Sequence, residues 1–594
     1  MTSSPLPPIP WQFTGNHWLS LPCIHPADGS LHGVGMLHRG ARAAIEFAGS
    51  RDFAEGTGPA LARPVITIDG RPLVLGDGTL AWERALGWLP TFTGSFDELV
   101  LRGTVFAPYG RDTDTAGAVY AIAVENRTDR ELTIGIALQG TLGYRQLRVR
   151  SARAFDDAHR ISRAEDDIVL LSGSALPDLV ALAIGADAEA QVEIGAGDSP
   201  TYSLSRTVRV APNGHAEVAF YLAAGPERDG AHATVGVMRR RGWRELLAGT
   251  RDALRTLEQS TGSEALDRLL NRNLLLAYFY AVGRALDDAH YYLVRTRAPW
   301  HSAGVTVREW EALMWTIPAV QLADAGLARE LLLRACELHG FAPGHGVRYL
   351  DGTLFQPGFS LEGAAAYALA IDRYIRDTGD DQIVDEPVLA DTLYLSGEDL
   401  AARRNERVPL YATEVSSSGR PAALPYTLHG NATVAQALEI LRRTLDEQSA
   451  RDVEDPEAVR AAIKRHFTSD REGKSTYASA IDLSGKTNAE DDPLASVLWL
   501  PLYETVDRSE SAYRRTVRAL DTTPHWLALQ CARLLGPDAS SVMKWLRRAP
   551  LDNGFAAEEI DPDGRAIGNG ADGALGGLLA YTLWYAVHAL GVDA

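Results

Sequence analysis

The amino-acid sequence predicts a multidomain α and β protein with an N-terminal antiparallel β-sandwich over residues 11–225, a helical linker over 226–262 and a C-terminal (α/α)6 barrel over 263–594. Short apolar runs separated by Gly, Pro and Asp fill the first part, which is typical of strands joined by turns. The apolar period then changes to that of amphipathic helices, and nearly everything after Gly262 is helical. About twelve helical segments, alternately more and less apolar, predict six hairpins that close a ring.

Composition restricts the class of ligand. The chain has 594 residues, too many for one core of the usual size, and its 46% hydrophobic and 23% charged residues are those of an ordinary globular protein. A formal net charge of -19 disfavours nucleic acid and anionic membrane surfaces as partners. We therefore expect a neutral small molecule or a carbohydrate as the ligand, and the sequence leaves the oligomeric state open.

Cysteine and histidine usage predicts neither disulfides nor a metal site. Cys23, Cys336 and Cys531 are far apart and in apolar company, and the fifteen histidines lack the spacing of metal ligands. No glycine-rich nucleotide-binding loop is present, so we expect no cofactor. The first residues lack the basic start and apolar stretch of a signal peptide, and no run of eighteen apolar residues occurs, so we expect a cytoplasmic protein.

Seven segments of the first part have the length and composition of strands. Along one of them, Leu99, Leu101, Gly103 and Val105 alternate with more polar residues, which indicates a half-buried strand. The predicted strands are 65–68, 99–106, 119–125, 132–138, 168–171, 191–194 and 218–222.

The linker is predicted as one amphipathic helix over 235–258, with leucines at helical spacing among arginines. The barrel helices are predicted from the same period and from their capping residues. They are 266–286, 309–325, 327–338, 362–377, 389–404, 431–447, 456–467, 494–503, 512–520, 525–535, 540–547 and 571–590.

Four connections in the barrel part, 340–361, 405–430, 468–493 and 549–570, hold about twenty residues each. This is far above the usual length of about 4 to 6 residues, and such long loops commonly carry function. They are rich in aromatic side chains, namely Tyr349, Phe355, Phe359, Tyr411, Tyr426, His429, Tyr477 and Phe555. We therefore expect a site at the end of the barrel that these loops share.

The last of these loops carries two acids, Glu558 and Glu559, just before a helix that is apolar nearly all round. Phe555 and two alanines precede the pair directly, which predicts that the backbone turns toward apolar surroundings. A carboxylate there either finds partners or takes part in chemistry. We interpret the pair as part of the site.

Several strings resemble those of known glycosidases. VREWEALMWTIPAVQLADAGLARELL (307–332), YATEVSSSGRPAALPYTLHGNATV, ASAIDLSGKTNAEDDPLASVLWLP and DNGFAAEEIDPDG resemble barrel segments of the inverting α-glycosidases of the glucoamylase type and of the amylo-α-1,6-glucosidase (glycogen-debranching) group. The last three are also similar to loops of metal-independent mannosidase-like proteins. The resemblance covers roughly residues 262–594 and implies a hydrolase that cleaves a terminal α-linked sugar with inversion.

An inverting glycosidase needs a carboxylic acid to protonate the leaving oxygen and a carboxylate to activate water, about 6.5 to 9.5 Å apart. The resemblance places Glu558 at the base position, with Glu559 as second choice, and Glu414 at about the position of the acid. Glu362 and Glu311 compete for the acid role. Glu414 precedes a serine-rich turn and is alternatively a solvated loop charge, and Glu362 is alternatively a helix-terminus carboxylate.

Trp300, His301, Trp310 and Trp499 are candidate platforms for sugar rings, with core packing as the alternative for indoles on apolar helices. Glu309 and Glu311 are two positions apart, so they do not share a helix face, and one of them is expected to pair with Arg308. Asp491 and Asp492 either accept hydrogen bonds from sugar hydroxyls or cap the next helix. The remaining predicted wall residues of the site are Tyr349, Asp351, Phe359, Tyr426, His429 and Phe555.

The arginine-aspartate signature of the family is altered around Glu309-Trp310-Glu311, and we expect the loss of a basic residue that holds the non-reducing sugar. The sugar is thus left open among glucose, mannose, rhamnose and rarer α-linked units. Gly568-Asn569-Gly570 before the last helix is a weak anion nest that keeps a glycoside phosphorylase as an alternative. The sequence is also compatible with a polysaccharide lyase and with a non-catalytic carbohydrate-binding protein of the same fold.

Overall fold

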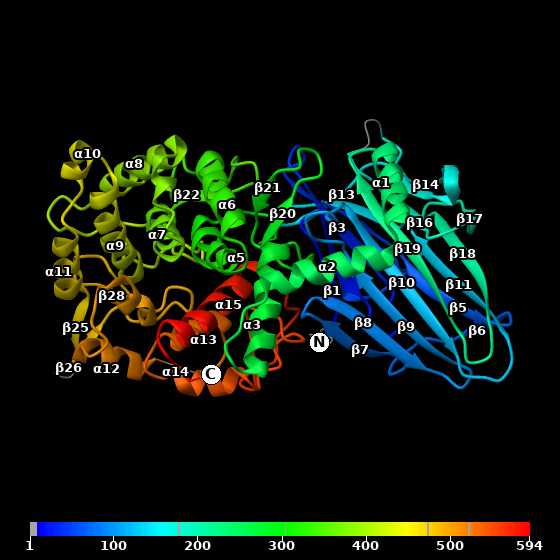
Figure 1. Ribbon diagram of the computed structural model, residues 1–594. Coiled ribbons are helices and arrows are strands. Elements are labelled where there is room, and N and C mark those ends of the chain that lie inside the picture. The colour runs from blue at the N-terminus through cyan, green and yellow to red at the C-terminus, as the bar shows by residue number, and fades with distance from the viewer. Residues whose placement is uncertain (1–8, 176–178, 303, 472–473, 521–522, 594) are drawn as a thin grey trace, which may run out of the picture. The chain divides into compact units, whose positions relative to one another are not determined.

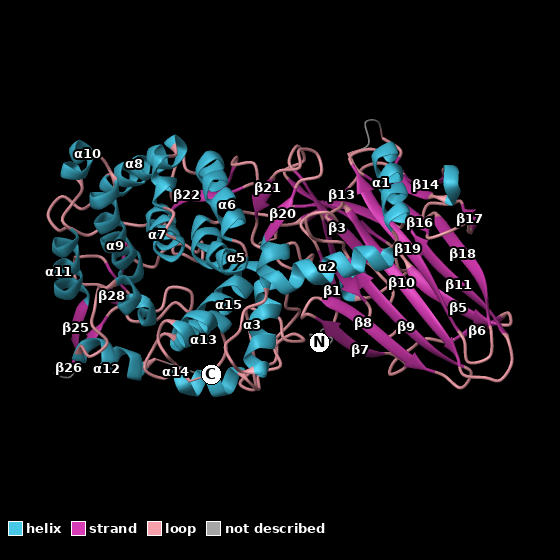
Figure 2. Ribbon diagram, in the orientation of Figure 1, coloured by secondary structure: helices cyan, strands magenta, loops and turns pink. Residues whose placement is uncertain are grey.

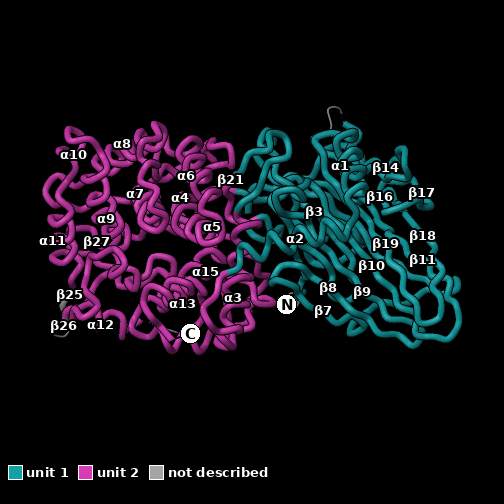
Figure 3. Tube along the Cα trace, viewed as in Figure 1, with its two compact units in different colours: residues 1–258, 282–291, 297–305 teal, residues 259–281, 292–296, 306–594 magenta. Residues whose placement is uncertain are grey.

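The computed structural model describes residues 9–175, 179–302, 304–471, 474–520 and 523–593 (Figure 1). The chain forms two compact units, coloured separately in Figure 3. Unit 1 comprises residues 1–258, 282–291 and 297–305, and unit 2 comprises 259–281, 292–296 and 306–594. Figure 2 shows that strands dominate unit 1 and helices dominate unit 2. None of the helices in the described residues is long and apolar enough to cross a bilayer.

Unit 1 is built from antiparallel sheets. The first has the order β1 (Gln12–Gly15), β2 (Leu19–Ile24), β3 (Gly33–His38), β4 (Ala43–Ala48), β12 (Tyr144–Arg148), β13 (Ala152–Ala154). The second has the order β14 (His159–Arg163), β15 (Val169–Gly173), β16 (Ala181–Ala186), β19 (His215–Gly225), β10 (Gly117–Asn126), β9 (Leu99–Phe106), β8 (Leu89–Ser95), β7 (Ala81–Ala85). The third has the order β17 (Gln191–Gly195), β18 (Thr201–Val210), β11 (Leu132–Thr141), β5 (Arg63–Ile68), β6 (Arg71–Leu73).

The three sheets share one apolar core, to which Met36, Leu101 and Ile136 belong as members of the first, second and third sheets. In β9 the buried Leu101, Gly103 and Val105 alternate with the exposed Arg102 and the half-buried Thr104, as predicted. All seven predicted strands overlap observed ones, and the predicted antiparallel β-rich part is confirmed. Strands β1 to β4 were missed because every residue in them is buried, and a strand buried on both faces shows no alternation.

The predicted single helix 235–258 is wrong, because the structure has two helices, α1 (Arg228–Arg241) and α2 (Trp243–Leu257). Gly242, with φ of 79°, lies between them in a backbone conformation that glycine adopts without strain. Both helices belong to the compact unit that contains the sheets.

Unit 2 is helical. Its α-helices are α3 (Glu264–Leu276), α4 (Glu309–Glu311), α5 (Ile317–Ala323), α6 (Ala325–His339), α7 (Leu361–Thr378), α8 (Pro387–Ala401), α9 (Leu428–Thr444), α10 (Glu447–Asp452), α11 (Pro456–Phe467), α12 (Ser511–Ala519), α13 (Leu527–Leu534), α14 (Ala539–Leu546) and α15 (Gly573–His588). Two π-helical turns, Ala277–Ala281 and Ala312–Thr316, continue α3 and join α4 to α5. The segment predicted as a helix over 494–503 is a 3₁₀ helix, Val497–Tyr503, with Pro501 inside it; a second 3₁₀ helix spans Asp381–Asp385.

Six segments form a closed inner ring in the described part of unit 2. Helix α5 contacts α7, α7 contacts α9, α9 contacts the 3₁₀ helix 497–503, that helix contacts α13, α13 contacts α15, and α15 contacts α5. Each inner member also packs against one outer helix, α6, α8, α11, α12, α14 and α3 respectively. The helices α7, α9 and α15 are buried over most of their length, as inner positions require. The predicted ring of six helical hairpins is confirmed.

Because inner and outer helices alternate along the chain, the inner helices run in the same direction and their N-terminal ends meet at one mouth of the ring. The long connections lead into these ends. They contain the short strands β22 (His345–Arg348), β23 (Leu354–Phe359), β24 (Tyr426–Thr427), β25 (Thr468–Arg471), β26 (Lys474–Tyr477), β27 (Ala480–Ile481) and β28 (Thr487–Asn488). The strands β20 (Val282–Arg284) and β21 (Tyr291–Leu293) precede the first inner segment.

Candidate active site

Buried polar side chains gather at the N-terminal mouth of the inner ring. Glu309 and Glu311 lie in α4, Glu362 in the first turn of α7, and His429 in the first turn of α9. All four are buried. The fifth, Asp572, is the N-cap of α15, where its side chain accepts a hydrogen bond from the Leu575 amide. These positions place several carboxylates near the positive ends of the inner helices.

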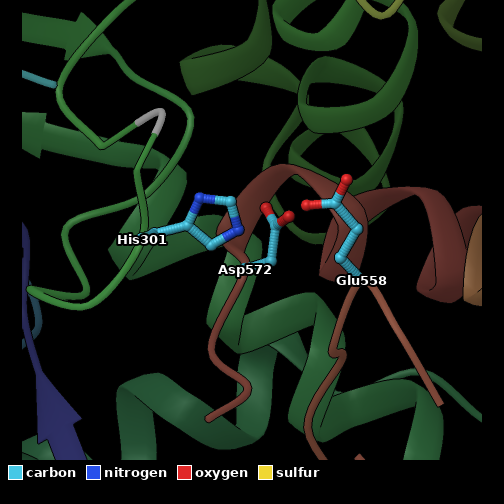
Figure 4. A group of neighbouring side chains, drawn as sticks. All are labelled: His301, Glu558 and Asp572. Carbon is cyan, nitrogen blue, oxygen red and sulfur yellow. The ribbon is translucent and has the colours of Figure 1, made fainter. Parts of the chain in front are cut away.

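An ion-pair network around Arg295 joins three of the acids. One terminal guanidinium nitrogen of Arg295 lies 2.7 Å from Asp572 Oδ2 and 3.4 Å from Glu558 Oε2, and the other lies 2.9 Å from Glu311 Oε1. Figure 4 shows the carboxylates of Glu558 and Asp572 side by side. Burial by itself would lower the pKa of Arg295, but Asp572 and Glu311 raise it above its ordinary value. Arg295 therefore stays charged.

The two adjacent glutamates of the last loop differ in their surroundings. The Glu558 side chain is 37% exposed and belongs to the Arg295 network. Glu559 is exposed, and its backbone pairs with Trp526. The structure thus brings Glu558, and not Glu559, into contact with the other acids.

Glu311 is held between two arginines. Its Oε1 accepts hydrogen bonds from Arg295 at 2.9 Å and from Arg308 at 3.0 Å. Its Oε2 is buried without a hydrogen-bond partner among the described residues. Glu311 thus ties Arg308 to Arg295 and is suited to hold Arg308 in place.

Glu309 has the opposite character. Its Oε2 accepts a hydrogen bond from the Gly344 amide at 2.7 Å and its Oε1 accepts one from the Tyr367 hydroxyl at 2.9 Å. Burial raises the pKa of Glu309 to about 8. Glu309 therefore keeps its proton to higher pH than an ordinary glutamate does.

Arg308, Glu309 and Trp310 line a cavity of about 30 Å³, together with Ser417 and the glycine-rich segment around Gly344. Arg308 lies in the wall of this cavity, and the expected loss of a basic residue that holds the non-reducing sugar stays a prediction. Arg308 Nε, Trp310 Nε1 and Ser417 Oγ are buried without hydrogen-bond partners among the described residues. This cavity thus offers unused hydrogen-bonding groups to a polar ligand.

A larger cleft of about 270 Å³ lies beside Glu362 and His429. Glu362 Oε1 shares a hydrogen bond with His429 Nδ1 at 3.1 Å, and its Oε2 accepts one from Ser360 Oγ at 3.1 Å. The His429 ring packs edge-on to Trp310, with ring centroids 5.3 Å apart. Ser416 lines both this cleft and the cavity beside Arg308.

Asp491 and Asp492 line the same cleft. Asp491 Oδ1 accepts a hydrogen bond from the Val497 amide, and Asp492 Oδ1 accepts one from the Leu494 amide, both at 3.0 Å. Each acid therefore caps a turn and also faces the cleft, and its binding of sugar hydroxyls stays a prediction. Burial raises the pKa of Asp491 to about 6, against the lowering effect of its hydrogen bonds to Ser496 and Val497.

Glu414, predicted as the acid, has different surroundings. Its side chain is 55% exposed, lies 2.8 Å from an Arg403 guanidinium nitrogen, and accepts a hydrogen bond from the Phe359 amide. The hydrogen bond from Arg403 lowers the pKa of Glu414. Its neighbours Val415 and Ser416 line the cavities described above, but Glu414 does not. The structure therefore does not bring Glu414 together with Glu558.

The other predicted wall residues fall into several groups. Phe555 is fully buried, Phe359 is buried under the Arg403 guanidinium, and Trp499 lines an apolar cavity inside the ring. The structure places the rest in local contacts: Tyr349 packs against Phe355, Asp351 accepts a hydrogen bond from the Thr353 amide, and the Tyr426 hydroxyl accepts one from Asn405. Trp300 and His301 lie in the segment 297–305, which belongs to unit 1.

Sequence reasoning missed Arg295 and Asp572. Arg295 lies outside any helix, and its partners are 16, 263 and 277 positions away, so no local pattern marks it. Asp572 does carry a signal, because an aspartate directly before an apolar helical stretch is a typical N-cap.

Two solved structures share the fold over nearly the whole chain, and a third is similar over part of it. A bacterial glucoamylase complexed with acarbose has a TM-score of 0.63 and 12% identity, covering 100% of this chain and 96% of its own. A protein assigned as a kojibiose phosphorylase from the human microbiome has a TM-score of 0.60 and 10% identity, covering 98% and 86%. A metal-independent α-mannosidase of Streptococcus pneumoniae in complex with α-1,6-mannobiose covers 57% of this chain and 97% of its own at 13% identity, with a TM-score of 0.46.

No protein-family profile matches the sequence, and no curated protein matches it significantly. At 10 to 12% identity the two full-length likenesses establish the fold and leave the activity open. The fold is that of the glucoamylase-like (α/α)6-barrel proteins preceded by an antiparallel β-domain, as the sequence resemblance predicted.

Proposed function

We propose that this protein cleaves a terminal α-linked sugar from an oligosaccharide or small glycoside by an inverting, two-carboxylate mechanism. The observation that carries the proposal is the presence of two carboxylates of opposite character at one mouth of the barrel. Glu558 lies beside the charged Arg295, and Asp491 lines the large cleft with a pKa raised to about 6. An inverting glycosidase needs such a difference, because one carboxyl donates a proton while the other accepts one.

Glu558 keeps the role of general base. Glu558 forms an ion pair with Arg295 at 3.4 Å, and the exposed third of its side chain leaves room for a water molecule. As water attacks the anomeric carbon, Glu558 accepts a proton from that water. Asp572 shares one Arg295 nitrogen with Glu558 and Glu311 binds the other nitrogen, so both act as positioning residues.

Asp491 replaces Glu414 as the proposed general acid. A proton donor must be protonated at working pH, which the raised pKa of Asp491 favours and the lowered pKa of Glu414 opposes. Asp491 gives its proton to the glycosidic oxygen as the bond to the anomeric carbon breaks. The products are the inverted sugar and the free aglycone, and both carboxyls return to their starting states by proton exchange with solvent.

Glu362 and His429 line the same cleft as Asp491 and are the proposed sugar-orienting pair. The hydrogen bond between them and the edge-on contact of His429 with Trp310 fix the ring of His429. A fixed imidazole and an indole edge are suited to hold a sugar hydroxyl and an adjacent apolar face.

The proposal is tested with a panel of synthetic α-glycosides of glucose, mannose and rhamnose, with the anomer of the first-formed sugar followed by NMR. The expected result is release of the β-anomer from at least one α-glycoside without added phosphate. Release of the α-anomer contradicts an inverting mechanism. No turnover of any glycoside, together with sugar binding, supports a non-catalytic carbohydrate-binding protein instead.

A glycoside phosphorylase is the second candidate, supported by the likeness to the kojibiose phosphorylase fold. In that reaction phosphate replaces water and no general base is needed. The candidate anion nest at 568–570 gives this candidate little support, since the Gly570 amide already donates to Asp552 Oδ2 at 2.6 Å. Turnover that requires orthophosphate and yields a sugar 1-phosphate would favour the phosphorylase.

A further inference from the structure

A second polar cavity lies far from the N-terminal mouth. It has a volume of about 180 Å³. Its lining includes Arg373 and Arg376 of α7, Gln436 of α9, Tyr503 at the end of the 3₁₀ helix, Tyr585 of α15, and Arg508 in the connection after that 3₁₀ helix. In α7, Arg373 follows Glu362 by eleven residues, which is roughly 16 Å along a helix axis. The cavity is therefore distinct from the cleft that holds Glu362 and Asp491.

Arg373 is the unusual residue of this cavity. It is only 8% exposed, and it lines both this cavity and the apolar one inside the ring. Among the described residues no ion pair or hydrogen bond involves Arg373, and its guanidinium lies over the face of Tyr581, 4.9 Å from the ring centroid. Buried arginines are normally paired with a carboxylate or hydrogen-bonded to carbonyl groups.

The contacts that Arg373 does have offset only part of the cost of burying its charge. A cation–π contact with one tyrosine is weak compared with the loss of hydration of a buried cation. The negative end of the α7 dipole acts within the last turn, and Arg373 precedes the end of the helix at Thr378 by five residues. The guanidinium is therefore short of a partner.

The neighbouring charges do not supply that partner. Asp372 is already shared between Arg443 and Arg376, the latter at 3.8 Å. Glu504 is exposed, and Arg508 adds a further cation at the cavity edge. Three guanidinium groups thus line one small cavity. Of its two carboxylates, that of Asp372 is already paired and that of Glu504 faces solvent.

We propose that this cavity binds a small oxyanion, a phosphoryl group, through Arg373 with Arg376 and Arg508. A guanidinium group recognises phosphate by two parallel hydrogen bonds, and a dianion matches several arginines better than a single carboxylate does. The tyrosine hydroxyl of Tyr585 and the amide of Gln436 lie in the same wall and can donate to the remaining oxygens. Orthophosphate and the phosphate of a sugar phosphate share this chemistry, and the experiment distinguishes them.

Tyr503 connects the two regions. Its side chain lines the second cavity, while its hydroxyl lies 3.5 Å from His429 Nε2 in the catalytic cleft. Tyr503 thus lies between the second cavity and the Glu362–His429 pair. The binding site itself does not depend on the proposed activity.

The test uses thermal unfolding and titration calorimetry of the full chain with orthophosphate, glucose 6-phosphate, glucuronate and glucose. Saturating orthophosphate or glucose 6-phosphate is expected to raise the Tm by about 2 °C or more. Glucose is expected to leave it unchanged. The tighter of the two phosphate compounds identifies the source of the phosphoryl group.

Variants separate this site from a structural role and from a phosphate site at the catalytic mouth. Arg373→Met keeps side-chain volume and removes an unpaired buried charge, so its Tm without phosphate is expected to equal or exceed that of the wild type while the phosphate-dependent shift disappears. Arg329→Gln, which removes a paired arginine on an outer helix, is the control and is expected to keep the shift. Arg508→Gln, at an exposed position, is expected to weaken phosphate binding at least threefold.

Several results would overturn the proposal. A wild type that shows no heat of binding and no Tm shift with millimolar orthophosphate or glucose 6-phosphate removes the site. A shift that persists in Arg373→Met places the phosphate elsewhere, as a phosphorylase would require. An equal shift with glucuronate contradicts the assignment to a phosphoryl group.

Discussion

Two loops of the barrel, 402–427 and 478–496, each carry acids and each lead into an inner segment, yet they prepare their acids in opposite ways. In the first, Glu414 is more than half exposed and paired with Arg403, which lowers its pKa. In the second, Asp491 lies in a cleft beside Asp492, and mainly its burial raises its pKa to about 6. Comparable places along the chain thus give one acid suited to remain ionised and one suited to carry a proton.

The largest loss of activity is expected at Glu558, the proposed base, which would act together with an acid from either loop. Glu558→Gln removes the proposed base, so we expect kcat to fall by about 10³-fold or more, since general bases contribute about 10² to 10⁴. The side chain is partly exposed and the amide can still contact Arg295, so the Tm is expected to stay close to that of the wild type. Steady-state kinetics and thermal unfolding measure the two quantities.

Glu559→Gln is the matched control, because it changes the adjacent and exposed acid of the same loop. We expect its kcat to remain within about twofold of the wild type, as is usual for surface positions away from the reacting groups. A larger loss in Glu559→Gln than in Glu558→Gln would transfer the role of base to Glu559.

The comparison of the two loops predicts a difference between a second pair of variants. Asp491→Asn removes the proposed acid, and kcat is expected to fall about 10²-fold or more for a substrate with a poor leaving group. Glu414→Gln is expected to change kcat less than about threefold, because its carboxylate is solvated and paired. Activated aryl glycosides, which need little protonation, should restore much of the Asp491→Asn rate. The reverse ranking would return the acid role to Glu414.

The outline of the fold could be predicted from local pattern, and the site could be predicted only in part. Apolar periodicity located the strands β9 and β11, which alternate between buried and more exposed residues, and the helices α7 and α15, which are buried over most of their length. It missed β1 to β4, which show no alternation, and the break at Gly242, where a single glycine is the only signal.

The partners of a carboxylate decide its role, and they come from distant parts of the chain. The sequence marked Glu558 because an apolar stretch precedes it, but it did not indicate Arg295, which is 263 positions away. In the sequence, Glu414 and Asp491 are both acidic residues in long connections, and nothing local distinguishes their roles. The pairing of Glu414 with Arg403 and the burial of Asp491 become visible only when the loops are folded onto the barrel.

The pH dependence sharpens the contrast between the loops. If Asp491 is the acid, activity requires its protonated form, so kcat/KM is expected to fall as pH rises above about 6. The groups that perturb Asp491 electrostatically are Asp492, which raises its pKa, and His429, which lowers it. Asp492→Asn should therefore move the basic limb of the profile to lower pH, and Glu414→Gln should leave it in place.

The smallest effect concerns a third acid, Glu309, in which burial raises the pKa to about 8. In the unfolded chain this group ionises near its ordinary pKa of about 4.5, so the folded state binds more protons between these two values. Stability is therefore highest below about pH 4.5 for this group and declines until pH passes about 8. Glu309→Gln keeps the shape of the side chain and removes its titration. The Tm difference, variant minus wild type, should therefore increase by a few degrees from pH 5 to pH 8. Calorimetry in matched buffers measures it. A constant difference across that range would mean that Glu309 is already ionised at pH 5, with Arg348 and the hydrogen bonds from Tyr367 and Gly344 outweighing its burial.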